Sequence, residues 1–237
     1  GQTGFDMSVL MTRKKRVIRS QQAGIKSLLE KRGVTLVYGR GKIICSGQAR
    51  VALAEGGNLD IQFDKLILAT GTAPLSMPDF PFDHDAILSS DDLLSLNHVP
   101  KSIVIVGAGV IGCEFAFILS ALGTQVTLVE GMSRVLPFPD MDADISKALL
   151  REMKKKKIRV ICDAVVQSAG TSQPGSPGKP GQVDISLGPS PFTDNPKPRP
   201  LKQTRLSAER MGVCVGRSPN TRQIGLSGLD VDISAQG

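Results

Sequence analysis

Three glycines and two glutamates between residues 103 and 130 have the types and spacing of a nucleotide site. Gly107, Gly109 and Gly112 form a GxGxxG pattern after the β-branched residues 103–106 and before an apolar helical pattern over residues 113–122. The first glycine of such a pattern permits a tight turn, the second lets the backbone approach a pyrophosphate, and the third lets helix and strand pack closely. The pyrophosphate is expected at the positive end of the helix.

A glutamate closes the strand that follows. Glu130 comes directly after the expected strand of residues 125–129, about 20 residues beyond the glycines. A carboxylate at this point can accept hydrogen bonds from the ribose hydroxyls of adenosine, and it would repel the 2′-phosphate of NADP. We therefore expect a dinucleotide site that takes NAD. Glu114 has two interpretations, a part of that site or a first-turn glutamate that stabilises the helix dipole.

Two other interpretations of this stretch explain less. Residues 102–123 are nearly apolar enough and long enough to cross a bilayer, which takes about 20 residues. Glu114 would then lie near the bilayer centre, where a charge is costly. The glycines could also serve packing alone, but that interpretation does not account for Glu130.

The elements around the glycines indicate a parallel sheet. Residues 101–160 alternate strand, helix, strand, helix and strand with short joints. Before them, residues 41–71 alternate β-forming and turn residues as an antiparallel meander would, and this segment finishes in an apolar strand expected at residues 66–69. Residues 20–31 have the pattern of an amphipathic helix. Residues 72–100 are a proline-containing connector with a short helical stretch, "SSDDLLSL", that Ser89 or Ser90 could cap.

The region of residues 168–205 differs from the rest because it is rich in Pro, Gly and Ser. It contains one alternating strand at residues 183–187, so we expect a hairpin interrupted by loops and partly disordered. The expected fold class is therefore α/β, with a Rossmann-like parallel sheet and antiparallel strands.

Composition and charge narrow the function classes. Hydrophobic residues make up 41% and charged residues 22%, which is typical of a globular chain. The net charge of +7 raises the question of nucleic acid or membrane partners, but Lys154 to Lys157 close a helix that opens near Asp142, as the helix dipole favours. Aromatic residues are 4% of the chain, which leaves little for stacking on nucleic acid bases. We expect no nucleic acid partner and no membrane.

The cysteines and histidines show no metal or catalytic pattern. Cys45, Cys113, Cys162 and Cys214 are far apart with no CxxC, so neither structural zinc nor a redox dithiol is expected. Unpatterned cysteines fit a reducing cytoplasm, each as a small buried hydrophobe. His84 and His98 lie in the connector without a partner acid pattern. No secretory signal is visible, and the chain begins with glycine, which indicates a fragment.

Three segments, taken in order, carry a family resemblance: "DKLILATGTAP", "SSDDLLSLNHVPKSIVIVGAGVIGCEFAFILSALGTQVTLVE" and "RMGVCVGRSPNT". The chain closely resembles the flavin-dependent pyridine nucleotide-disulfide oxidoreductases, and most of all the dihydrolipoamide dehydrogenases among them. The resemblance is weak over residues 168–205. It implies part of an FAD-binding domain at residues 1–98, an NAD-binding domain at residues 99–222, and a return toward the FAD domain at residues 223–237.

The resemblance also implies roles for individual residues. Glu114 would lie near the nicotinamide, Glu130 would bind ribose, Val165 would touch adenine, and the backbone of Gly216 would face the cofactor. The NAD positions implied in full are Gly107, Ala108, Gly109, Val110, Ile111, Gly112, Glu114, Glu130, Val165 and Gly216, and the FAD positions are Gly41, Thr70, Gly71 and Thr72.

The same resemblance implies parts that this sequence does not contain. Family members have a redox-active cysteine pair, an FAD-binding GxGxxG and a C-terminal interface domain that carries the catalytic His and Glu and forms homodimers. No catalytic residue is therefore expected here, and FAD is expected only with the missing segments. The full enzyme would pass electrons from a lipoyl dithiol through FAD to NAD, in the cytoplasm or, in a eukaryote, the mitochondrial matrix. The alternative is a truncated, non-catalytic module that binds NAD or another protein.

Overall fold

The computed structural model describes residues 5–171, 181–198 and 200–234. The chain divides into two compact units. One comprises residues 74–216 and the chain up to residue 7, and the other comprises residues 8–73 and 217–237. The sequence predicts domain limits at 98/99 and 222/223, whereas the compact units meet at 73/74 and 216/217. The first limit differs because β5 (Ile87–Ser89) pairs with a strand of the parallel sheet.

The parallel sheet that the sequence predicts is the centre of the unit of residues 74–216, and it has five strands. Its strand order is β5, β12, β6, β7, β8. The strands after β5 are β12 (Arg210–Val213), β6 (Ser102–Val106), β7 (Gln125–Val129) and β8 (Arg159–Ile161). The chain runs from β6 outward to β7 and β8 and then returns to the opposite side of β6 at β12, so the strand order reverses between β6 and β12.

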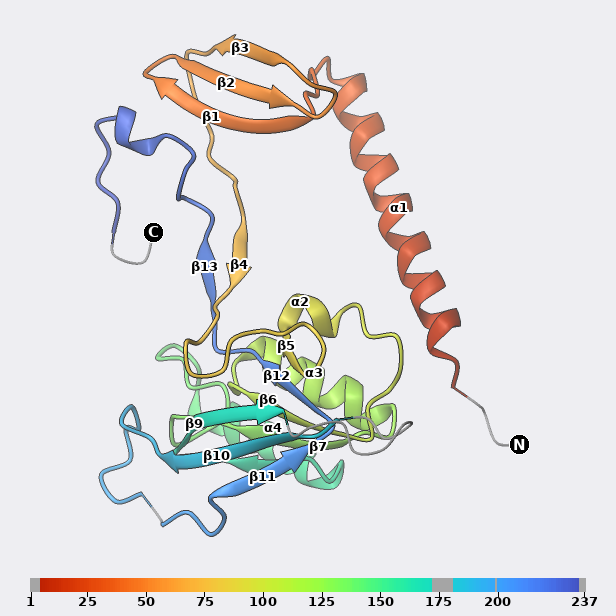
Figure 1. The fold of residues 1–237 in the computed structure, drawn as a ribbon, viewed down its shortest axis with the longest axis vertical. Coiled ribbons are helices and arrows are strands. Elements are labelled where there is room, and N and C mark those ends of the chain that lie inside the picture. Colours follow the sequence, from red (N-terminus) through yellow and green to blue (C-terminus); the bar gives the residue numbers. More distant parts are fainter. Residues whose placement is uncertain (1–4, 172–180, 199, 235–237) are drawn as a thin grey trace. The chain divides into compact units, whose positions relative to one another are not determined.

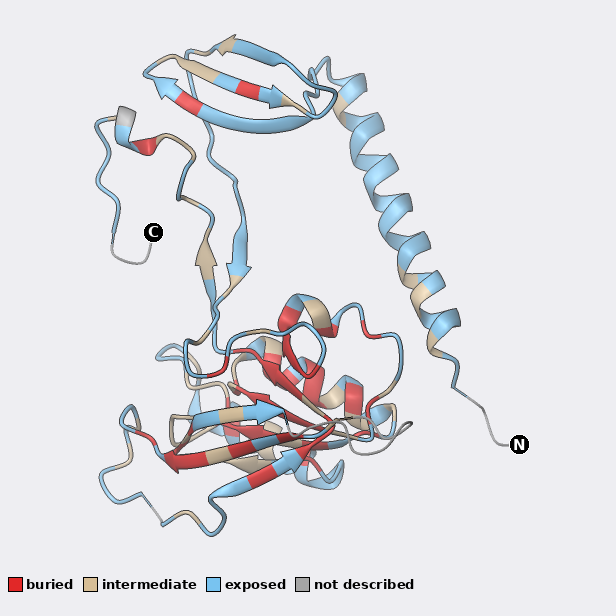
Figure 2. Ribbon diagram, viewed as in Figure 1, coloured by how far each residue is buried: buried red, intermediate tan, exposed pale blue. Residues whose placement is uncertain are grey.

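Structured layers cover both faces of this sheet, as Figure 1 shows. Ile103 and Ile105 of β6 pack with α3 (Val110–Ala121) and α4 (Ala143–Lys155). Val104 and Val106 pack with the antiparallel strands on the other face. Strands that are buried on both faces have continuous apolar sequences, and β6 has such a sequence. The expected α/β fold class is confirmed, and Figure 2 shows the buried residues concentrated along these strands.

The antiparallel sheet consists of β9 (Ala164–Thr171), β10 (Val183–Pro189) and β11 (Arg205–Ala208), with β10 in the middle. The strand predicted at residues 183–187 is confirmed and is two residues longer. Partial disorder was expected over residues 168–205. Residues 172–180 and 199 of this region lie outside the described part of the chain.

The stretch from residue 103 to residue 130 is a strand, a turn, a helix and a strand. Within the described ranges, no helix is both long enough and apolar enough to cross a membrane. The helix begins at Val110, three residues earlier than the sequence pattern indicates.

Local capping agrees with the sequence at two helices. Ser89 caps α2 (Ser90–Leu93) in a reciprocal pair with Asp92, because each side chain bonds the backbone N–H of the other residue. Asp142 caps α4, and Lys154 and Lys155 lie in its last turn. The prediction that the lysine cluster closes a helix is confirmed.

The unit of residues 8–73 and 217–237 contains the predicted meander of β1 (Gly39–Cys45), β2 (Gln48–Leu53) and β3 (Asn58–Gln62). The strand expected at residues 66–69 is wrong, because no described segment pairs with it and a strand requires a partner. Instead β4 (Thr72–Pro74) pairs with β13 (Arg217–Pro219). The helix predicted at residues 20–31 is α1 (Met7–Lys31), which starts earlier and has no buried residue.

Residues 224 and 225 dock on β1. The Ile43 N–H donates to the Ile224 carbonyl at 2.8 Å. Gly225, at φ 87°, is so close to β1 that a Cβ there would lie 2.0 Å from the Ile43 oxygen. Only glycine fits this contact, after which the chain forms the short 3-10 helix η1 (Leu226–Gly228).

Candidate functional site

The turn from β6 into α3 leaves no room for side chains at two of its glycines. Gly107 has φ 97°, and a Cβ there would lie 2.5 Å from the Cys214 carbonyl oxygen beyond β12. A Cβ on Gly112 would lie 1.9 Å from the Gly107 oxygen. The first glycine therefore lets the turn pass close to β12, and the third lets the helix sit on the turn.

Gly109 differs from its two neighbours in the motif. It is the N-cap of α3, with an extended backbone and φ −70°. A Cβ there would meet only the Phe138 Cζ at 3.5 Å, which is an ordinary contact. The protein's own packing thus tolerates a side chain at Gly109, but that side chain would enter the cavity that Gly109 lines.

Glu130, at the end of β7, holds the glycine turn in place through hydrogen bonds. It is 8% exposed. Its Oε2 accepts a hydrogen bond from the Ala108 N–H at 2.6 Å, and its Oε1 accepts one from the Met132 N–H at 2.8 Å. Each carboxylate oxygen can accept a second hydrogen bond, so Glu130 retains acceptor capacity while it holds two loops together.

These groups open on one cavity of about 890 Å³ at the carboxyl ends of β6, β7 and β12. The reversal of strand order between β6 and β12 lies at the same edge, where open α/β sheets bind their ligands. The residues expected at a cofactor that line this cavity are Gly107, Gly109, Val110, Ile111, Glu130, Val165 and Gly216.

Three of the expected NAD positions do not line the cavity. Ala108 is fully buried, and Gly112 packs on the turn. Glu114 is exposed and does not line the cavity, but it follows the lining residue Val110 by four positions, on the same face of α3.

The expected FAD positions belong to the other unit. Asn220 donates to the Thr70 carbonyl at 3.1 Å, and its own N–H donates to the Gly71 carbonyl at 3.0 Å. The Arg217 guanidinium donates to the hydroxyl and the carbonyl of Thr72. Gly41 is exposed on β1. A cavity of about 500 Å³ in this unit is lined by other residues, among them Lys42 and Arg222, so it does not gather these four positions.

Several residues that line the cavity were not predicted from the sequence. Leu75, Met77 and Phe80 come from the stretch that the sequence presents as a connector, and Phe138 and Phe192 come from loops. None of them belongs to a periodic pattern or a motif. Their only signal in the sequence is that apolar side chains interrupt polar, proline-containing segments.

The three cysteines near the cavity are poor nucleophiles. Burial, with the charge of Glu130, raises the pKa of Cys113 to about 11 and that of Cys162 to about 12. Burial also raises the pKa of Cys214 to about 12. These side chains stay protonated near neutral pH and serve packing. The expectation that each cysteine is buried is confirmed for Cys113 and Cys214, but Cys162 is only half-buried and Cys45 is exposed on β1.

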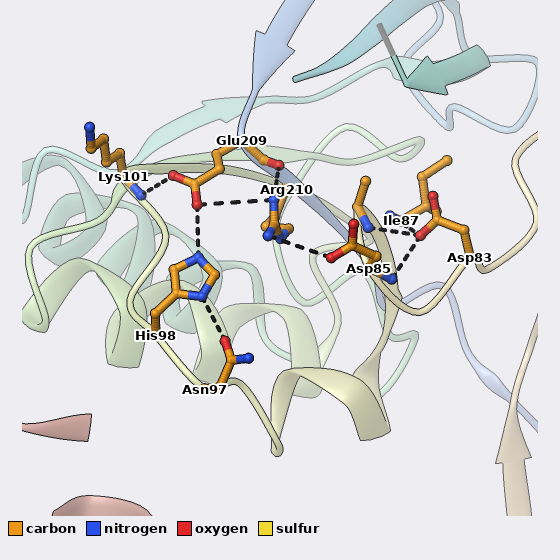
Figure 3. A network of polar contacts seen from close by, with 9 residues as sticks. Asp83, Asp85, Ile87, Asn97, His98, Lys101, Glu209 and Arg210 are labelled. Carbon is orange, nitrogen blue, oxygen red and sulfur yellow. Dashed lines mark hydrogen bonds and ion pairs between the residues drawn. The ribbon is translucent and has the colours of Figure 1, made fainter. Parts of the chain in front are cut away.

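The opposite edge of the sheet carries a closed polar network, drawn in Figure 3. Glu209 accepts a hydrogen bond from the Lys101 N–H at 2.9 Å and contacts His98 Nε2 at 2.8 Å. Arg210 lies 4.0 Å from Glu209 and 3.6 Å from Asp85. Burial alone would raise the pKa of Glu209, but these hydrogen bonds and nearby charges hold it below its ordinary value.

The sequence shows no partner acid pattern for the histidines, but in the structure each of them contacts a carboxylate. His98 pairs with Glu209, which is 111 positions away in the sequence. His84 Nδ1 lies 3.0 Å from Asp92 Oδ2, on α2. The His98–Glu209 pair joins the connector to the start of β12, whereas His84 and Asp92 both lie within the connector. Neither pair lines the cavity.

Known proteins of one family match almost the whole chain. A family model described as "Pyridine nucleotide-disulphide oxidoreductase" matches residues 3–236. Dihydrolipoyl dehydrogenase 1, mitochondrial, of Arabidopsis thaliana is 30% identical over 98% of this chain and 42% of its own length. Leghemoglobin reductase of Vigna unguiculata is 31% identical over 96% of the chain and 40% of its own length. The chain thus spans less than half the length of these relatives.

Two solved structures share the fold. LpdA from Mycobacterium tuberculosis superposes with a TM-score of 0.82 at 24% identity, covering 100% of this chain and 48% of that one. The HOCl-induced flavoprotein disulfide reductase RclA from Escherichia coli gives a TM-score of 0.78 at 22% identity, with 100% of this chain and 48% of that one covered.

Proposed function

The chain belongs to the pyridine nucleotide-disulphide oxidoreductase family, and we propose that its unit of residues 74–216 binds NAD(H). The observation that carries the proposal is the glycine turn of residues 107–112, which opens beside buried Glu130 on an 890 Å³ cavity. This cavity lies where doubly wound sheets bind dinucleotides.

The residues present fit such a cofactor. The cavity is within the usual range of about 300–1,000 Å³ for small-molecule sites and has mostly apolar walls. We assign the pyrophosphate to the backbone at Gly109 and Val110, at the N-terminus of α3, where backbone N–H groups and the helix dipole favour an anion. We assign the adenosine ribose to the free acceptor capacity of Glu130 and the adenine to Val165. Gly216 and Glu114 are assigned to the nicotinamide end.

The same arrangement favours NAD over NADP. A carboxylate at Glu130 accepts hydrogen bonds from ribose hydroxyls and repels a 2′-phosphate. Two backbone N–H groups hold that carboxylate in place, so it cannot swing away to admit the phosphate without leaving both donors unpaired.

The wider reaction is a second part of the proposal. We propose that the chain represents the NAD-binding portion of a dihydrolipoamide dehydrogenase-type flavoprotein, with Gly41, Thr70, Gly71 and Thr72 belonging to the FAD-binding portion. When bound, NAD supplies the hydride acceptor, and the protein's task is to bind and orient it. The lipoyl-dithiol substrate, the FAD, the homodimer and a cytoplasmic or mitochondrial-matrix location belong to the longer protein. This chain alone is expected to bind NAD(H) without oxidising dihydrolipoamide.

Calorimetric titration of the chain with NADH tests the proposal. Gly109→Val should leave the fold intact and weaken NADH binding by about tenfold or more, because the side chain occupies the path of the pyrophosphate. Gly170→Ala is the matched control, since a Cβ there meets nothing within 4 Å and the residue does not line the cavity. Absence of NADH binding to the unmodified chain would refute the NAD assignment. Flavin bound at one equivalent, with dihydrolipoamide turnover, would refute the statement that this chain is inactive alone.

A further inference from the structure

Phe192 is an exposed aromatic residue at the edge of the cavity. Its side chain is 70% exposed, yet it lines the cavity together with Glu130 and Val165. Phenylalanine is usually buried, and a single exposed one is common enough to need no explanation. Phe192 needs one because of where it lies and how firmly its segment is held.

Polar contacts, most of them to Asp163, fix the segment on both sides of Phe192. The Ser190 N–H donates to the Asp163 carbonyl at 2.9 Å, and the Ser190 hydroxyl accepts from the Phe192 N–H at 3.1 Å. The Thr193 hydroxyl donates to the Asp163 carboxylate, which also accepts from the Asn195 amide at 3.2 Å. Asp163 therefore anchors this segment to the turn between β8 and β9.

A third anchor comes from the loop after β7. Asp194 accepts a hydrogen bond from the Ser133 N–H at 3.3 Å. This N–H belongs to the same loop as Met132, whose N–H is held by Glu130. The segment that carries Phe192 is thus tied to the loop that the candidate ribose-binding acid organises.

The position of Gly131 places the ring beside that acid. An added Cβ on Gly131 would lie 3.6 Å from Val165 Cγ1 and 3.8 Å from Phe192 Cδ2. Both side chains thus flank the residue that follows Glu130. An apolar side chain and an aromatic ring therefore lie beside the residue that follows Glu130, the side chain to which the ribose is assigned above.

We propose that Phe192 is a base-binding residue that stacks on the adenine of the bound dinucleotide. The proposal rests on the proposed function, because it assigns the adenine end of the same cavity. The Phe192 ring gives this end an aromatic face, which a flat purine can cover while water leaves both surfaces. Anchoring the segment in advance lowers the entropy cost of ordering it when the ligand binds.

Titration of the full chain with three probes tests the assignment. NADH and ADP-ribose contain adenine, whereas nicotinamide mononucleotide does not. Phe192→Ala should weaken NADH and ADP-ribose binding by roughly tenfold, as loss of one base-aromatic stack does, and should leave nicotinamide mononucleotide unchanged. Phe192→Tyr keeps the ring and should retain wild-type affinity, while Phe192→Leu, apolar but not aromatic, should be intermediate. The exposed position predicts unchanged melting temperatures for all three variants.

Each other outcome has a separate meaning. If the unmodified chain binds NADH and Phe192→Ala binds it equally well, Phe192 does not stack and the NAD assignment stands. If Phe192→Ala weakens all three probes alike, or lowers the melting temperature in parallel, the residue supports the loop and not the base, and the stacking proposal is wrong. If the unmodified chain binds no NADH while Gly170→Ala and the unmodified chain both melt cooperatively, the NAD assignment fails and the stacking proposal fails with it.

Discussion

At the carboxyl edge of the five-stranded sheet, Glu130 is 8% exposed and accepts hydrogen bonds from two backbone N–H groups. At the amino edge, Glu209 is 6% exposed and meets one backbone N–H, a histidine and an arginine. The two residues have the same chemistry and nearly the same burial. They differ in what surrounds the remaining acceptor capacity of the carboxylate.

Around Glu130 the remaining acceptor capacity faces a cavity, and its hydrogen-bond partners among the described residues are backbone N–H groups. Around Glu209 two of the three partners, Arg210 and His98, carry positive charge or can do so, and the third is the Lys101 backbone N–H. Burial of a carboxylate is thus not by itself a sign of a ligand site. The sign is a buried carboxylate whose protein partners leave acceptors directed at open volume.

The largest expected effect tests how strongly the glycine turn at the carboxyl edge contributes to the free energy of unfolding. Gly112→Ala places a Cβ 1.9 Å from the Gly107 oxygen, a backbone atom that cannot move without opening the turn. We expect a loss of at least about 3 kcal/mol in the free energy of unfolding, measured by urea denaturation. Gly170→Ala, with no neighbour within 4 Å, should change it by less than about 1 kcal/mol. Equal stability of the two variants would mean that the turn is looser than described.

An intermediate effect separates the two glutamates. Glutamine offers one acceptor and one donor group, so Glu130→Gln cannot accept from both Ala108 and Met132. We expect it to lose about 1–3 kcal/mol of stability and to weaken NADH binding. Glu209→Gln should lose a similar amount, because Arg210 and His98 lose their charged partner, but should bind NADH as the unmodified chain does. Weakened NADH binding in both variants would remove the distinction between the edges.

The smallest expected effect is on the pH dependence of stability. The pKa of Glu209 is lowered in the folded chain, so its stabilising contribution is present above the ordinary glutamate pKa, near 4.5. That contribution is lost as the pH falls through the lowered value. The difference in unfolding free energy between the unmodified chain and Glu209→Gln should therefore shrink measurably, by up to about 1 kcal/mol, as the pH falls from 6 to 3. A constant difference would contradict the network of Figure 3.

The carboxyl edge could be predicted from the sequence because the residues that form it lie close together along the chain. A β-branched run, three glycines and a closing glutamate lie within 28 residues, and each has a mechanical reason that does not depend on distant segments. The expectation of a dinucleotide site followed from that stretch, while the family resemblance also needed the segments that begin at Asp64 and Arg210. The remaining walls of the cavity could not be predicted, because Phe80 and Phe192 reach it from segments without periodicity.

The contacts at the amino edge could not be predicted from the sequence. His98 and Glu209 are 111 positions apart, and neither has a motif around it. Their pairing depends on β12 returning beside β6, which is a property of strand order and not of local sequence. For the same reason, the expected strand at residues 66–69 was wrong, since its β propensity is local but its partner would have to come from elsewhere.

The contact between Gly225 and β1 has a consequence for how the chain is made. The unit of residues 74–216 is nearly continuous in sequence and can fold as soon as it leaves the ribosome. The other unit combines residues 8–73 with residues from 217 onward, and the Ile43 N–H of β1 donates to the Ile224 carbonyl. This contact can form only after residues 74–216 have been synthesised. A nascent chain stalled before residue 217 would therefore carry the residues that line the cavity but would leave β1 without its Ile224 partner.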